Sequence, residues 1–186
     1  MNRINGTLAL SPIGAFQEPL ITAVAEAVTV AFDCDTTVAP LLTDAEFAFD
    51  PRRHQYHSTA ILERLAAGAP DHALKIIGLT SVDLFIPILT HVFGEAQLGG
   101  RACVVSTCRL LHSTAPRSAE APYHRLTKEA VHELGHTFDL RHCPETACVM
   151  HFCRSETDVD LKSGRFCRYC RVLLDDAMAD IRKGLP

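Results

Sequence analysis

Residues 132–136, with the sequence HELGH, constrain this chain more than any other part of it. Residues i and i+4 lie on one face of an α-helix, so a helix here would point the imidazoles of His132 and His136 at a single ion. A catalytic zinc takes three protein ligands and keeps one position for water. The spacing therefore predicts a helix from about residue 123 to residue 140 with a zinc site on one face.

Glu133 lies between the two histidines and is rotated by about 100° from His132 around the helix axis. It can therefore reach past the ion toward a water bound there. Zinc lowers the pKa of a bound water to about 7, and a neighbouring carboxylate can then take its proton. The pattern predicts that Glu133 activates a zinc-bound water for hydrolysis. The alternative is an exposed helix that carries two His and a Glu by chance.

The third ligand of this zinc has two candidates, Asp139 and His142. Asp139 shares the helical face of His132 and His136, but it would lie ~10 Å along the axis from His132 if the helix continued. His142 can fold back toward the ion if the helix ends near Asp139. We therefore expect the catalytic zinc to be held by His132, His136 and His142.

Eight cysteines are unevenly spread along the chain, and five of them follow residue 142. We expect no secretory signal at the start of the chain, and in a reducing compartment clustered cysteines are more often metal ligands than disulfides. Two pairs of thiolates suit a closed tetrahedral zinc that adds folding free energy, with free thiols as the alternative. The expected ligands are Cys143, Cys148, Cys167 and Cys170. The competing Cys153 falls outside both pairs, and Cys34, Cys103 and Cys108 are expected in the core or at the surface.

The overall composition favours a soluble protein with one domain, or with one domain and a small appendage. The chain has 186 residues, of which 47% are hydrophobic, and this suffices for a real core. Its formal net charge of −4 is unlike the basic surface that nucleic acids select. The longest apolar stretch, residues 20–32, contains Glu26 and is shorter than the ~20 residues of a spanning helix. We expect a cytoplasmic protein with no membrane and no nucleic-acid partner.

Segments with strand and helix character alternate along the chain. Strands are expected at residues 6–10, 35–38, 74–79 and 102–107, and helices at residues 19–32, 58–67, 123–140 and 170–182. Pro87 interrupts the apolar residues 84–93, which indicates an edge or a bulge. Residues 40–53 and 113–122 are expected to be loops. The alternation favours an α/β fold with a mainly parallel sheet and helices packed against it.

Several of these motifs together resemble the archaemetzincin family of metalloproteases. The resemblance rests on HELGH, on the adjoining His142 and Cys143, on Cys148-Val149-Met150 and on the final Cys-x-x-Cys pair. It extends upstream to residues 92–96 (VFGEA), 104–110 (VVSTCRL) and 128–131 (KEAV). The likeness covers roughly residues 74–171 and is most specific in its second half.

The resemblance implies a metzincin-like fold and a zinc metallopeptidase that hydrolyses peptide bonds. The expected architecture is a twisted mixed sheet with an antiparallel edge strand near residues 90–93, backing helices and an active-site helix. Residues 1–142 would form the upper subdomain, and residues 143–186 a small C-terminal subdomain with a terminal helix. The implied cofactors are two zinc ions per chain, one catalytic and one structural. Met150 would be the Met-turn residue beneath the histidines, and the partner would be a peptide or protein substrate.

Asp139 departs from the family pattern, which has Gly three residues after the second His. Gly allows a sharp turn at the helix end, often with φ > 0, and Asp is among the few residues that also adopt this conformation. We therefore expect the turn to be kept. A zinc-binding interaction protein with little turnover is the alternative function. The presence of Glu133 favours the enzyme, because a structural site needs no general base.

Overall fold

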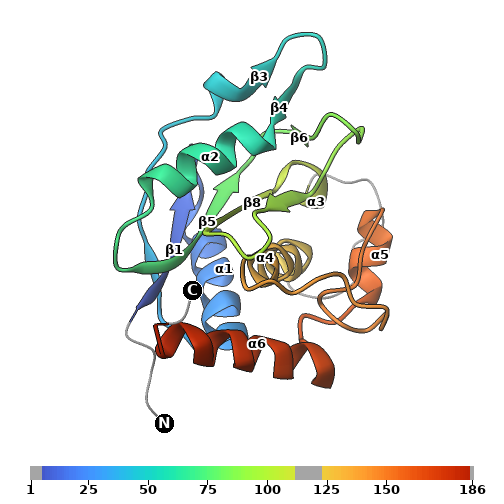
Figure 1. Cartoon of the computed structure of the whole chain (residues 1–186). Helices are drawn as coiled ribbons and strands as arrows, with labels where there is room; N and C mark the ends of the chain where they lie inside the picture. Colours follow the sequence, from blue (N-terminus) through green and yellow to red (C-terminus); the bar gives the residue numbers. More distant parts are fainter. Residues whose placement is uncertain (1–5, 112–122, 185–186) are drawn as a thin grey trace.

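The computed structural model describes residues 6–111 and 123–184, and a five-stranded sheet lies at its centre (Figure 1). The strand order is β2-β1-β5-β8-β7. The strands are β1 (Thr7–Pro12), β2 (Thr36–Val38), β5 (Ala73–Thr80), β7 (Gly94–Ala96) and β8 (Ala102–Ser106). All neighbours pair in parallel except β7, which runs antiparallel to β8 at the edge. The expected mixed α/β fold with one antiparallel edge strand is confirmed.

The position expected for that edge strand was wrong by a few residues. Residues 90–93 were expected to form it, whereas β7 begins at Gly94. Val92 instead pairs with Leu84 in an isolated antiparallel bridge, and its N–H donates to the Leu84 carbonyl at 3.0 Å. Because the chain first pairs with another strand, it joins the edge of the main sheet only at Phe93, whose carbonyl accepts from the N–H of Ser106.

Helices cover both faces of the main sheet. Figure 1 shows α1 (Glu18–Phe32) and α4 (His124–Thr137) on one face and α2 (Ser58–Gly68) on the other. Successive side chains of a strand point to opposite faces. Accordingly, Ile76 packs in the core beneath α2, whereas Ile77 packs in the core beneath α1 and α4. A Cβ atom at Gly78 would lie 2.5 Å from Cδ1 of Leu65, so glycine here lets α2 approach the sheet.

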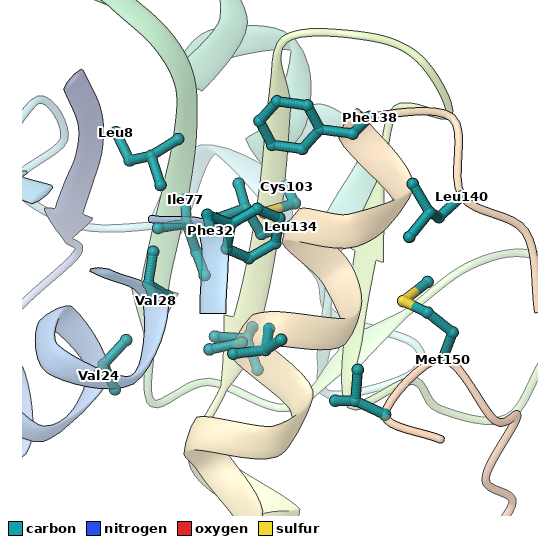
Figure 2. Close-up of a cluster of buried hydrophobic side chains, with 14 of the residues drawn as sticks. Leu8, Val24, Val28, Phe32, Ile77, Cys103, Leu134, Phe138, Leu140 and Met150 are labelled. Atoms are coloured by element: carbon teal, nitrogen blue, oxygen red, sulfur yellow. The ribbon is translucent and has the colours of Figure 1, made fainter. Parts of the chain in front are cut away.

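The core between α1 and α4 fixes the active-site helix against the sheet (Figure 2). Val24, Val28 and Phe32 point from α1 into this core, and all three are at most 1% exposed. The rings of Phe32 and Phe138 stack with their centroids 5.3 Å apart. Each fully buried side chain of this size adds about 1.5–3 kcal/mol to folding. The position of α4 is therefore set by apolar packing along its length.

A second, smaller sheet lies beyond α2 and was not expected. It has the order β3-β4-β6, with β3 (Phe49–Asp50), β4 (Gln55–His57) and β6 (Leu84–Phe85). Residues 40–53, expected as a loop, contain a short 3-10 helix, Glu46–Ala48, and β3. These pairings involve only two or three residues per strand, which is too few to show a period in the sequence.

The remaining helices are α3 (Cys108–Leu111), α5 (Glu156–Leu161) and α6 (Arg168–Arg182). The last begins two residues before its expected start, and α4 ends at Thr137 rather than at residue 140. Helix α5 was not expected from the sequence, although Ser155 and Asp158 form a capping box at its start. The loop expected at residues 113–122 lies outside the described residues. Within the described parts of the chain, no helix is long and apolar enough to cross a membrane.

Candidate active site

Three histidine rings converge at the C-terminal end of α4. His132 and His136 come from consecutive turns of the helix, and His142 comes from the segment that follows it. The ring centroids are 4.7 Å apart for His132 and His136, 5.3 Å for His132 and His142, and 4.9 Å for His136 and His142. One ring nitrogen from each histidine lies within 4.8 Å of the others. This near-equilateral arrangement brings together the three residues predicted from the sequence.

Backbone carbonyls orient the two histidines of the helix. Nδ1 of His132 lies 2.8 Å from the carbonyl oxygen of Val149, and Nδ1 of His136 lies 2.6 Å from that of Leu140. A carbonyl only accepts, so each Nδ1 carries the proton and each Nε2 keeps its lone pair. Metal-ligating histidines typically make this second hydrogen bond. The two Nε2 atoms face each other at 3.1 Å.

The protonation state of these rings suits a cation at the site. Burial lowers the pKa of His132 well below its usual value and lowers that of His136 to about 4. Burial also lowers the pKa of His142. Near neutral pH the rings are therefore uncharged, and two unshared lone pairs at short range repel each other. A metal ion between them removes this repulsion, and neutral imidazole is a common zinc ligand.

Asp139 makes the turn that brings His142 to the site. Its φ is +64°, in the left-handed region, as expected for the residue that replaces glycine. The N–H of Asp139 donates to the carbonyl of His136 at 3.0 Å, and the N–H of Leu140 donates to that of Gly135 at 3.3 Å. The helix ends here because these bonds close its last turn.

Glu133 lies beside the histidines and beneath the edge strand. Its side chain is buried, and burial raises the pKa of its carboxyl well above the usual value, with Glu129 and Glu95 adding to the rise. A Cβ atom at Gly94 would lie 2.6 Å from Cγ of Glu133 and 2.5 Å from the carbonyl oxygen of Val104. Glycine at the start of β7 therefore leaves the space that this carboxylate occupies.

Met150 packs directly against the active-site helix (Figure 2). A Cβ atom at Gly135 would lie 2.6 Å from its Sδ atom, so only glycine permits this approach. Met150 is fully buried, and its carbonyl accepts from the N–H of Cys143 at 2.9 Å. The methionine therefore supports the helix between the turns that carry His132 and His136.

A buried ion pair lies behind the histidines and was not expected from the sequence. Nζ of Lys162 is 2.6 Å from Oε1 of Glu129, and the side chains are 0% and 4% exposed. The same Nζ lies 3.4 Å from the carbonyl oxygen of His151. Glu129 precedes His132 by three residues and so shares its helical face, a signal that the sequence did contain. No spacing in the sequence connects Lys162 to this helix.

The four expected cysteines form a second cluster, which begins at Cys143, next to His142 in the sequence. The sulfur atoms of Cys143, Cys148, Cys167 and Cys170 all lie within 4.8 Å of one another. The N–H of Cys167 donates to Sγ of Cys148 at 3.3 Å, and that of Cys170 donates to Sγ of Cys167 at 3.5 Å. Burial raises the pKa of Cys148 and Cys170 and so disfavours their thiolates. A bound cation offsets this cost, and four thiolates at these distances suit tetrahedral zinc.

Cys153 and His151 lie near the two clusters but belong to neither. Cys153 is outside the cysteine cluster and lines the cleft at the histidines. His151 is partly buried, and its Nδ1 lies 3.0 Å from the carbonyl oxygen of Cys143.

A cleft of about 580 Å³ opens over the three histidines and Glu133. Its lining residues are Leu89, Thr90, His91, Val92, Phe93, Gly94, Ala96, Glu129, His132, Glu133, His136, His142, Phe152, Cys153 and Arg154. Besides α4 and His142, the lining comes from two segments, one leading into β7 and one following Met150. Neither segment was expected from the sequence to line the site.

Comparison with known proteins agrees with this geometry. The model of peptidase family M54 matches residues 38–176. The archaemetzincin of Methanopyrus kandleri is 46% identical over 129 residues, which are 69% of this chain and 71% of that protein. The crystal structure of the Methanopyrus kandleri archaemetzincin matches with a TM-score of 0.79 at 35% identity, covering 94% of this chain and 96% of that chain. The structure of a zinc-dependent peptidase from Methanocorpusculum labreanum matches with a TM-score of 0.80 at 27% identity, covering 90% and 100%.

The family match spans the histidine cluster, Glu133 and the cysteine cluster, and the structural matches extend over nearly the whole chain. This favours the hydrolase over the interaction protein. The chain belongs to peptidase family M54, the archaemetzincins, and is a zinc metallopeptidase that acts on peptides or proteins.

Proposed function

We propose that Glu133 is the general base and that His132, His136 and His142 hold the catalytic zinc. When bound, zinc supplies a positive charge that polarises the attacking water and the peptide carbonyl. The observation that carries the proposal is the buried Glu133 carboxylate, which lines the same cleft as the three histidines. A general base works best when its pKa lies near the operating pH, and burial raises the pKa of Glu133.

In this proposal, a carboxylate oxygen of Glu133 takes a proton from the attacking water. The same carboxyl then gives the proton to the nitrogen of the leaving amine as the peptide bond breaks. The carbonyls of Val149 and Leu140 keep the proton of each helix histidine on Nδ1, so that both Nε2 atoms face the site. The segment before β7 and the residues after Met150 hold the substrate between them.

We also propose a structural zinc held by Cys143, Cys148, Cys167 and Cys170, which organises residues 143–186 as a smaller C-terminal unit. The cluster joins two segments that have little core of their own, and its thiols are close enough for one ion. Elemental analysis of the metal-replete protein should find two zinc equivalents per chain. One equivalent would contradict the second site.

The general-base assignment is tested by Glu133→Gln, which keeps the size of the side chain and removes the base. Zinc content should remain that of the parent, while turnover of a peptide substrate falls by about 10²–10⁴-fold or more. Glu63→Gln is a matched control, because Glu63 is exposed on α2 on the far face of the sheet. An unchanged turnover number in Glu133→Gln would rule out this mechanism.

A further inference from the structure

Among the charged residues that line the active-site cleft, Arg154 has no role in the proposed catalytic centre. Glu133 and the three histidines belong to the proposed catalytic centre, and Glu129 is neutralised by its ion pair with Lys162. Much of the remaining lining is apolar and includes Leu89 and Phe93 on one wall and Phe152 on the other. The guanidinium of Arg154 is the strongest charge left for a substrate to meet.

Arg154 is exposed, and the structure gives its guanidinium no carboxylate partner among residues 6–111 and 123–184. The nearby Asp158 is occupied by the backbone, since its Oδ2 accepts from the N–H of Arg154 at 2.9 Å and from that of Ser155 at 3.0 Å. These bonds belong to the cap of α5 and hold the backbone of Arg154 in place. The Arg154 side chain therefore extends from a backbone that hydrogen bonds hold in place beside the cleft.

Phe152 lies near both the Arg154 guanidinium and His142 of the proposed catalytic centre. Its ring centroid lies 4.9 Å from that of His142, and Cζ of Arg154 lies 5.9 Å from the Phe152 ring. An extended peptide advances about 3.3 Å per residue. The distance from His142 to Phe152 and the distance from Phe152 to Arg154 together therefore correspond to no more than about three residues of a substrate bound at the histidines.

Building on the proposed function, we propose that Arg154 makes the cleft selective for peptides that carry a carboxylate within about three residues of the bond that is cut. The carboxylate is an Asp or Glu side chain or the free C-terminus of the substrate. Arg pairs with carboxylates through two parallel N–H···O bonds, and the apolar walls accept the neighbouring side chains. A Lys or Arg in the same place would be repelled.

The test measures binding without turnover, so it does not depend on the proposed chemistry. The probes are fluorescein-labelled, C-terminally amidated peptides of one apolar sequence, with Glu, Gln or Lys placed in turn at each position. A further peptide has only Gln and a free C-terminal carboxylate. Fluorescence anisotropy gives the Kd of each with the zinc-loaded Glu133→Gln protein and with the same protein carrying Arg154→Gln or Arg154→Glu. Arg168→Gln is the control, because Arg168 is exposed at the start of α6, outside the cleft.

We expect Glu to lower Kd relative to Gln by about threefold to tenfold at one or more positions at low salt, and Lys to raise it. Arg154→Gln should abolish this preference, Arg154→Glu should invert it, and Arg168→Gln should leave it intact. Preference for the amidated Glu peptides assigns the site to an internal acidic residue, and preference for the free C-terminus alone assigns it to a terminal carboxylate. Equal Kd values for the Glu peptides, the Gln peptides and the peptide with a free C-terminal carboxylate, a preference that survives Arg154→Gln, or no binding of any peptide would overturn the proposal.

Discussion

At the scale of single residues, Asp139 decides where the active-site helix stops. Its left-handed conformation, with φ of +64°, costs a non-glycine residue roughly 1–2 kcal/mol, although Asp is among those that tolerate it best. The turn carries the chain back so that His142 meets His132 and His136. Asp139 itself does not belong to the cluster of metal-ligating atoms in the described structure.

Substitutions at Asp139 should therefore follow backbone preference rather than metal chemistry. Asp139→Gly and Asp139→Asn should keep the catalytic zinc and the thermal midpoint, because both residues adopt the left-handed conformation. Asp139→Val should lower the midpoint and weaken zinc binding, because a β-branched residue is strained there. Zinc content and thermal unfolding of the three variants measure this. Loss of zinc from Asp139→Gly would mean that Asp139 is a ligand after all.

The ion pair of Glu129 and Lys162 permits a second prediction at this scale. Removing one partner of a buried pair leaves an uncompensated charge and costs roughly 3–5 kcal/mol. Lys162→Met should therefore lower the free energy of unfolding by about this amount in urea titrations, and the double variant with Glu129→Gln should recover part of it. Lys183→Met is the control, because Lys183 and its partner Asp180 are 65% and 55% exposed. Equal midpoints for Lys162→Met and Lys183→Met would show that the buried pair contributes little.

At the scale of elements, the edge strand β7 positions Glu133, the proposed general base. Its antiparallel pairing with β8 sets Gly94 opposite Val105, above the Glu133 side chain. On its other side β7 is tied to the start of α2, where the hydroxyl of Thr59 donates to Oε1 of Glu95 at 2.9 Å and that of Ser58 donates to Oε2. A strand of only three residues can position Glu133 because β8 holds it on one side and the start of α2 holds it on the other.

Gly94→Ala should therefore displace Glu133 and also strain the edge of the sheet. The added methyl group would lie 2.6 Å from Cγ of Glu133, which must shift, and 2.5 Å from the carbonyl oxygen of Val104 in the neighbouring strand. A displacement of about 1 Å in a catalytic group can lower turnover by about 10²-fold. We expect a loss of this size in kcat with zinc content retained. Gly164→Ala is the control, because its Cβ would make an ordinary contact of 3.9 Å with Lys128, and similar kcat values for the two variants would contradict this role for Gly94.

At the scale of the whole molecule, the two clusters are joined by three consecutive residues. Cys148 belongs to the cysteine cluster, the carbonyl of Val149 orients His132, and Met150 packs against Gly135. A change at the cysteines can therefore reach the histidine cluster through this segment, and also through Cys143, which directly follows His142. The same hydrophobic core contains residues from α1, α4 and α6, so the C-terminal part is packed against the rest of the chain.

This connection predicts that Cys167→Ser affects both sites. The variant should lose the structural zinc and have a lower thermal midpoint, because metal binding at such a site is folding free energy. It should also bind the catalytic zinc about 10–100-fold more weakly, the usual effect of disturbing the partners of a metal-ligating histidine. Chelator competition monitors the second effect. Cys108→Ser, at a half-buried thiol outside both clusters, should change neither, and full catalytic zinc affinity in Cys167→Ser would separate the two sites.

The local patterns of the chain were informative because they depend on neighbours in sequence. The spacing of HELGH put two imidazoles on one helical face, and the alternation of apolar segments indicated the parallel sheet. The turn at Asp139 followed from the conformations open to that residue. The second sheet was missed because its strands are two or three residues long, and α5 was missed although its capping box could have indicated it.

The sequence by itself determined the helix that presents His132, Glu133 and His136, the grouping of four cysteines and the mainly parallel sheet. Spacing encodes the helix and each pair of cysteines because their residues are near one another in the chain, and the alternation of strand and helix segments indicates the mainly parallel sheet. Only the tertiary structure decided which groups surround them. Gly94 meets Glu133 across 39 positions of the sequence and Lys162 meets Glu129 across 33, so only packing of the whole core brings these pairs together. The walls of the cleft, including Arg154, are set in the same way, because distant segments share a surface only after the core has formed.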